Sequence, residues 1–134
     1  MKALLAVAAV VGLFAAPAYA ACTYPKSPDK IPDGNSATLE EMLAAKKQVD
    51  VYRKEIEGDT DSPGYLGCIK KEYEDVLAKD AAADAKSKMT DAQKKDLEKR
   101  EVQKNNAAVD ELQQVANRLN EQIRLFKAKS APKT

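Results

Sequence analysis

The feature that most constrains the fold is a run of apolar residues, alternately three and four apart, in the last third of the chain. Its positions are Val102, Asn105, Val109, Leu112, Ala116, Leu119, Ile123 and Phe126, and only Asn105 is polar. This spacing is that of a heptad seam, which places all the positions on one face of a long helix. We therefore predict a helix over 91–129 whose seam packs on other helices, followed by a frayed tail over 130–134.

Two further helices are predicted upstream of this seam. Thr38 followed three residues later by Glu41 is a capping box, which opens a helix over 38–57. Pro63 suits the first position of a helix, because the missing N–H has no partner there in any case. It therefore opens a second helix, over 63–86.

A second capping box, Thr90 with Gln93, predicts a tight turn near 87–90. An antiparallel hairpin about this turn places Val76 opposite Val102. The same register gives the pairs Tyr73 with Asn105, Ile69 with Val109, and Leu66 with Leu112. The last helix is longer than the second, so the rest of its seam needs the first helix. That helix is either collinear with the second or folds as a third helix beside it. The fold class is thus all-α, either an elongated antiparallel hairpin or a three-helix bundle.

The first twenty residues have the three regions of a secretory signal peptide. Lys2 is followed by an uninterrupted apolar or small run over 3–16, and Ala18-Tyr19-Ala20 provides small residues at a cleavage site after Ala20. We therefore expect a periplasmic protein. The alternative, a lipoprotein acylated at Cys22, is disfavoured because Tyr19 stands where that signal requires Leu.

The chain after Ala20 has 114 residues, with 21 basic and 21 acidic side chains. Large apolar residues make up about a fifth of it, which is little for one compact core. An elongated shape or a homo-oligomer is the expected response. The balanced charge gives no indication of a nucleic-acid partner, and no segment after Ala20 is long and apolar enough to span a membrane.

Cys22 and Cys68 are the only cysteines, and in an oxidising compartment they are expected to form a disulfide. Three prolines, Pro25, Pro28 and Pro32, make the segment over 21–37 an extended arm that cannot be helical. The disulfide would tie this arm to the second helix.

The residues that usually carry chemistry are missing. There is no His, so the commonest neutral-pH base and metal ligand is absent. Asp59 and Asp61 are too few oxygen ligands for a calcium loop, and no phosphate-binding or nucleophile motif occurs. We predict no catalytic residue, no metal ligand and no cofactor.

The spaced prolines, Ile31-Pro32-Asp33-Gly34, and Tyr65-Leu66-x-Cys68 together resemble a group of small uncharacterised periplasmic proteins of proteobacteria. The resemblance covers Cys22 to Ile69. In that group the first helix runs straight into the Tyr-Leu-x-Cys element, whereas here 58–64 interrupts it. The resemblance implies export to the periplasm and no particular activity.

Two classes of function remain. The first is a non-enzymatic periplasmic protein that acts through protein–protein contacts or as an envelope component, with an unknown protein partner. The second is a small holdase-like chaperone, which would need exposed apolar surface for its clients.

Overall fold

The computed structural model describes residues 21–131, and the predicted signal peptide, with its cleavage site after Ala20, lies outside them. The described chain forms α1 (Leu39–Glu57), α2 (Gly64–Ala82) and α3 (Asp91–Ser130), with no strand among the described residues. This confirms the all-α fold class.

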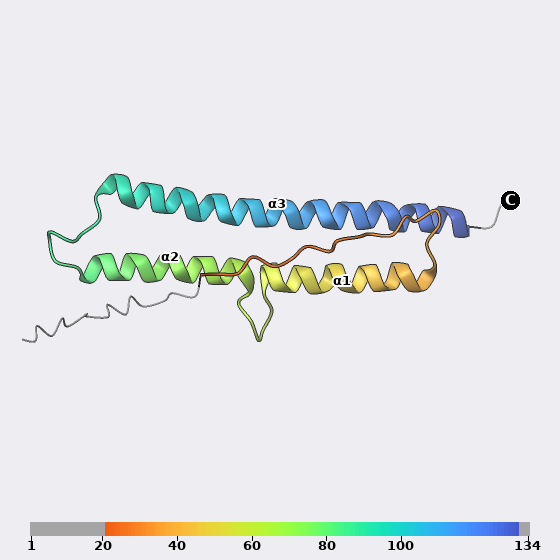
Figure 1. Ribbon diagram of the computed structural model, residues 1–134, viewed down its shortest axis with the longest axis horizontal. Coiled ribbons are helices and arrows are strands. Elements are labelled where there is room, and N and C mark those ends of the chain that lie inside the picture. Colours follow the sequence, from red (N-terminus) through yellow and green to blue (C-terminus); the bar gives the residue numbers. More distant parts are fainter. Residues whose placement is uncertain (1–20, 132–134) are drawn as a thin grey trace, which may run out of the picture.

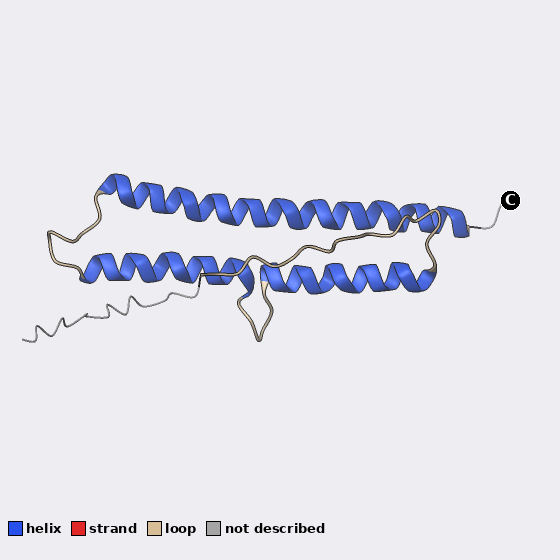
Figure 2. Cartoon of the chain, in the orientation of Figure 1, coloured by secondary structure: helices blue, strands red, loops and turns tan. Residues whose placement is uncertain are grey.

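The three helices form a long rod. α1 and α2 lie end to end along one side, and α3 runs antiparallel to both along the other side (Figure 1). With 40 residues, α3 is about 60 Å long at 1.5 Å per residue. The first helix is therefore collinear with the second. The arm (residues 21–37) runs along the rod as an irregular segment beside α1 and α3 (Figure 2).

Both predicted capping boxes are present. The Thr38 hydroxyl accepts a hydrogen bond from the Glu41 N–H at 3.2 Å, and the Glu41 carboxylate accepts one from the Thr38 N–H at 2.7 Å. Thr90 and Gln93 make the same reciprocal pair at the start of α3. Each box satisfies two backbone N–H groups at a helix start, where no helical partner exists.

The predicted end of the second helix at residue 86 is wrong, because α2 ends at Ala82. The Asp84 carboxylate accepts hydrogen bonds from the N–H groups of Lys86 and Ser87 at 3.0 and 2.9 Å. Such local side-chain bonds compete with the helical pattern and outweigh the helix propensity of the surrounding alanines. The connection to α3 is therefore an eight-residue loop (83–90) rather than a tight turn. At its other end, α2 begins one residue after Pro63.

The joint between α1 and α2 depends on two glycines. Gly58 and Gly64 have φ angles of +84° and +63°, in the region that favours glycine. Their backbones also touch, because a Cβ on Gly64 would lie 2.3 Å from the Gly58 nitrogen. The chain thus leaves the rod at Gly58 and re-enters at Gly64, which produces the protruding loop seen between the two helices in Figure 1.

The core is concentrated in one half of the rod. We call this the arm half: the arm, α1, and α3 from Ala108 onward. Its buried cluster comprises Ala45, Val49, Tyr52, Ile56, Ala108, Leu112, Val115 and Leu119. The other part, which we call the hairpin half, consists of residues 69–107, that is α2 from Ile69, the loop and the first part of α3.

The predicted seam of α3 is displaced in the hairpin half. Val102 is 45% exposed, so its predicted place opposite Val76 is wrong. Val76 instead lines a hollow with Leu97 and Glu101. The reason is that the loop over 83–90 begins earlier in the chain than the predicted turn near 87–90. Each α2 residue therefore faces a residue closer to the start of α3 than predicted.

In the arm half the predicted seam lies only partly in the core. Leu112 and Leu119 are buried, whereas Val109, Ala116, Ile123 and Phe126 are partly exposed. Ala108 and Val115 are fully buried, although the heptad seam does not include them. With Leu112 and Leu119 they are four, three and four residues apart, so the buried stripe of α3 is itself a heptad seam in which Ala108 and Val115 replace the predicted Val109 and Ala116.

Candidate functional site

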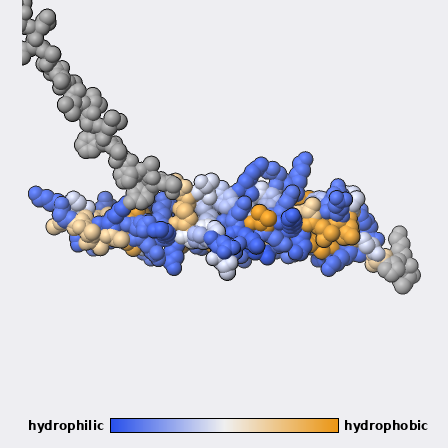
Figure 3. Space-filling view, turned by 90° about the horizontal axis from the view of Figure 1, so that it is seen from below, coloured by the Kyte–Doolittle hydropathy of each residue, from blue (hydrophilic) through white to orange (hydrophobic). Residues whose placement is uncertain are grey.

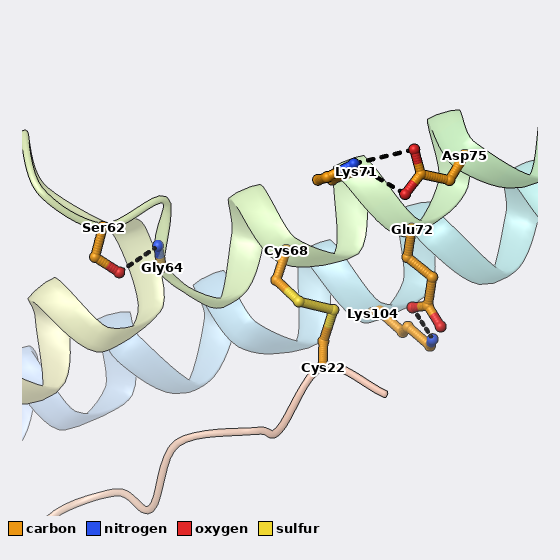
Figure 4. The surroundings of a disulfide bond; sticks show 8 residues. All are labelled: Cys22, Ser62, Gly64, Cys68, Lys71, Glu72, Asp75 and Lys104. Carbon is orange, nitrogen blue, oxygen red and sulfur yellow. Dashed lines mark hydrogen bonds and ion pairs between the residues drawn. A yellow bond between two sulfur atoms is a disulfide. The ribbon is translucent and has the colours of Figure 1, made fainter. Parts of the chain in front are cut away.

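The arm is fastened to the rod at its start by the disulfide. Cys22 and Cys68 are bonded with an S–S distance of 1.99 Å, which confirms the predicted pairing. Figure 4 shows the bond joining the arm to α2, close to where α2 begins. The arm is thereby fixed to α2 and then runs along α1, so it crosses the joint between the two helices and braces it.

A cluster of tyrosines forms the second attachment. The Tyr24 hydroxyl donates a hydrogen bond to the Glu111 carboxylate on α3 at 2.7 Å, and its ring meets the Tyr65 ring edge-on at 4.9 Å. The Tyr52 hydroxyl lies 3.4 Å from that of Tyr24.

Tyr24 and Tyr52 do not titrate near neutral pH. Burial, followed by the hydrogen bonds with Tyr52 and Glu111, raises the pKa of Tyr24. Burial is also the largest cause that raises the pKa of Tyr52. An ordinary tyrosine already titrates near pH 10, so both hydroxyls keep their protons and the attachment is independent of pH in the neutral range.

The third attachment is the turn at the end of the arm. The Gly34 N–H donates to the Gln122 side-chain oxygen at 2.8 Å, and the Lys129 ammonium donates to the Ala37 carbonyl at 2.8 Å. A Cβ on Gly34 would lie 2.0 Å from the Gln122 backbone oxygen. Only glycine allows this approach, so the Pro-Asp-Gly sequence seats the arm directly on the backbone of α3.

The outer face of α1, which we define by Leu39, Leu43 and Val51, is the most apolar exposed part of the helices. These side chains are 61%, 58% and 48% exposed. The space-filling view in Figure 3 shows hydrophobic surface over the first part of α1, with a smaller spot farther along the helix. Leu39 and Leu43 are one turn apart and lie side by side.

An open hollow adjoins this face. It has a volume of about 700 Å³ and lies between the arm and α1, with Val51, Lys26 and Glu55 among its lining residues. A second hollow of about 650 Å³ continues along the arm to Tyr65 and Cys68. The linings combine apolar surface with charges of both signs, which suits a protein contact better than a small charged ligand.

The acidic loop between α1 and α2 is held by hydrogen bonds of its own side chains. The Asp59 carboxylate accepts hydrogen bonds from the N–H groups of Asp61 and Ser62 at 3.0 and 3.1 Å. Within residues 21–131, no group of three or more His, Cys, Asp or Glu side chains is placed to hold a metal ion. Asp59 therefore has a structural role in shaping this loop.

Asp80 links α2 to the 83–90 loop and to the start of α3. It is the only charged residue that is buried in the described chain, and its carboxylate accepts a hydrogen bond from the Met89 N–H. The Lys94 ammonium lies 3.0 Å from the same carboxylate. The Met89 hydrogen bond, and then Lys94, lower the pKa of Asp80. Sequence reasoning missed this residue because nothing in its local pattern distinguishes it from the other acids.

No helix within the described residues is long and apolar enough to cross a membrane. No family model, no curated protein and no solved structure matches this chain. The candidate site therefore rests on the geometry of this chain alone: the outer face of α1, on a rod that the arm braces from α2 to the end of α3.

Proposed function

We propose that this chain is a non-enzymatic periplasmic protein that acts through protein–protein contacts, with the outer face of α1 as its binding surface. The observation that carries the proposal is the exposure of Leu39 and Leu43, at 61% and 58%. Covering a leucine that is otherwise in water is worth about 1.5–3 kcal/mol. Neighbouring exposed leucines on one helix are therefore typical of a surface that a partner covers.

The rigidity of α1 supports the same proposal. Its inner face buries Met42, Ala45, Val49, Tyr52 and Ile56, so the helix is held in place before any partner arrives. A preorganised surface loses little conformational entropy on binding. The disulfide supports export, since such bonds persist in oxidising compartments.

The proposal is tested by affinity capture from periplasmic extract with the chain that begins at Ala21. The bait is compared with a double variant, Leu39→Gln with Leu43→Gln, and with a control, Val102→Gln, which alters another exposed apolar residue on α3. We expect a partner that the wild type and the control retain and the double variant loses. Retention of every partner by the double variant would contradict the proposal.

The same exposed leucines also suit the second candidate, a holdase-like chaperone. A chaperone suppresses the aggregation of unrelated unfolded clients, whereas an interaction protein binds a defined partner. Light scattering of an unfolded client distinguishes the two: suppression by the wild type that the double variant loses would assign the chaperone function instead.

A further inference from the structure

The hairpin half lacks an apolar interior of its own. Of residues 69–107, only two are buried: Ile69, where this half meets the arm half, and Asp80, which is a carboxylate. The buried residues of α3 begin at Ala108. Two paired helices cannot enclose a core by themselves, because each leaves part of its apolar face at the edge of the contact.

A groove runs along the seam between the two helices of this half. It consists of adjoining hollows of about 160, 440 and 290 Å³, and Val76 lines all three. Leu97 lines the first two and Met89 the last two. These three side chains are only partly buried. In the arm half the arm covers the equivalent seam, whereas no described segment covers this one.

We propose that a second copy of the chain covers this groove, so that two hairpin halves pack as an antiparallel four-helix bundle. The missing third layer would then be supplied by the α2 and α3 of the other copy, as in other bundles built from paired hairpins. The surface on the outer face of α1 stays free in this arrangement, so the inference does not depend on the proposed function.

The charges indicate a second copy rather than a partner of opposite charge. Residues 70–101 carry nine basic and nine acidic side chains, so this stretch of the chain has no net charge. A surface that pairs with itself about a two-fold axis must complement itself. Asp96 and Arg100 line the groove on either side of Leu97 along α3, and within one chain they form an ion pair of 2.9 Å. Antiparallel packing of two α3 helices about this level sets two such pairs side by side in opposite directions, so that Arg100 of each copy also meets Asp96 of the other.

The oligomeric state of the oxidised chain from Ala21 onward tests the inference. Sedimentation from about 1 to 100 µM is compared for the wild type, Leu97→Glu in the groove, and Leu43→Glu as a control with the same change of charge at the other end of the rod. We expect the wild type and the control to reach the dimer mass as concentration rises, and Leu97→Glu to stay a monomer with unchanged helicity by circular dichroism. A wild type that is monomeric throughout, a Leu97→Glu dimer, or a Leu43→Glu monomer would overturn the inference.

A second variant keeps the test decisive if Leu97→Glu does not fold. Arg100→Cys places a thiol beside the groove, and Lys127→Cys places one near the far end of α3. A short bis-maleimide reagent should join two Arg100→Cys chains at residue 100 and leave Lys127→Cys monomeric, as read by peptide mapping. Equal cross-linking of the two variants, or none at position 100, would contradict the two-fold packing.

Discussion

The arm half and the hairpin half share α3, yet they bury very different amounts of apolar surface. α1 and α2 have the same length of 19 residues. α1 buries five residues, among them Tyr52 and Ile56, whereas α2 buries Ile69 and Asp80. Both helices pack on α3, yet only α1 buries many residues. Packing on α3 therefore does not by itself explain where the core forms.

The difference lies in the arm, which acts as a third layer over α1 and α3. Ile31 packs against the buried cluster, and Tyr24 contacts Tyr52 and Glu111. The buried apolar residues of this chain therefore lie where the arm covers α1 and α3. Changes in one half of the rod should therefore affect stability differently from matched changes in the other half.

The largest effect is expected when the arm is released from α2. Cys68→Ala opens a cross-link between residues 46 apart, which is worth about 3 to 4 kcal/mol in the chain-entropy account. Urea denaturation should show this loss, and Cys22→Ala should match it. An unchanged midpoint, or two alkylatable thiols in the exported native protein, would contradict the braced structure.

The next effect compares one residue type in the two halves. Leu119 is 5% exposed in the arm half, so Leu119→Ala should cost about 2 to 4 kcal/mol of unfolding free energy. Leu97→Ala, at a partly exposed position in the hairpin half, should cost less than half of that in dilute protein. Equal losses in chemical denaturation would show that the halves do not differ as described.

A smaller loss is expected where the arm meets α3. Gly34→Ala introduces a Cβ that would lie 2.0 Å from the Gln122 carbonyl oxygen, so the turn must move away. Overpacking of this kind costs about 1 to 3 kcal/mol. The control is Asn35→Ala, at the exposed neighbouring position. A thermal melt in which both variants match the wild type would show that the turn is not seated on α3.

The smallest effect is the pH dependence of the hairpin half. Because the pKa of Asp80 is lowered in the folded protein, its carboxylate stabilises the fold above its unfolded pKa, near 4. That stabilisation is lost as pH falls through the lower, folded pKa.

We therefore expect stability to be nearly flat from pH 6 to 8, where the chain has no His to titrate. The stability difference between wild type and Asp80→Asn should shrink below about pH 4. Titration of the unfolding free energy checks this expectation, and a difference that stays constant down to pH 2 would show that Asp80 is not held as described.

Sequence patterns predicted the parts of this fold that depend on local chemistry. The capping residues Thr38 and Thr90 placed two helix starts, because their hydrogen bonds involve neighbours three residues away. The disulfide followed from there being only one pair of cysteines. These features need no knowledge of the rest of the fold.

The parts that depend on contacts between distant segments were harder to predict. The end of α2 follows from Asp84 bonding within the loop and from Asp80 reaching Met89, and no spacing rule contains those bonds. Ala108 and Val115 are buried on α3, each one residue before the predicted seam positions Val109 and Ala116. Heptad spacing predicts a seam, but how α3 is turned toward the segments on which it packs depends on contacts with those segments.

Hydrogen exchange of backbone amides in dilute, oxidised protein compares the two halves residue by residue, since it reports local stability along the whole chain. If the arm stabilises its half of the rod, amides exchange slowly in α1 and in α3 from about Leu112 to Ile123. We expect exchange at least tenfold faster in α2 beyond Ile69 and in α3 before residue 105. Equal protection along α3, or stronger protection in the hairpin half, would contradict the claim that the arm determines where this molecule is stable.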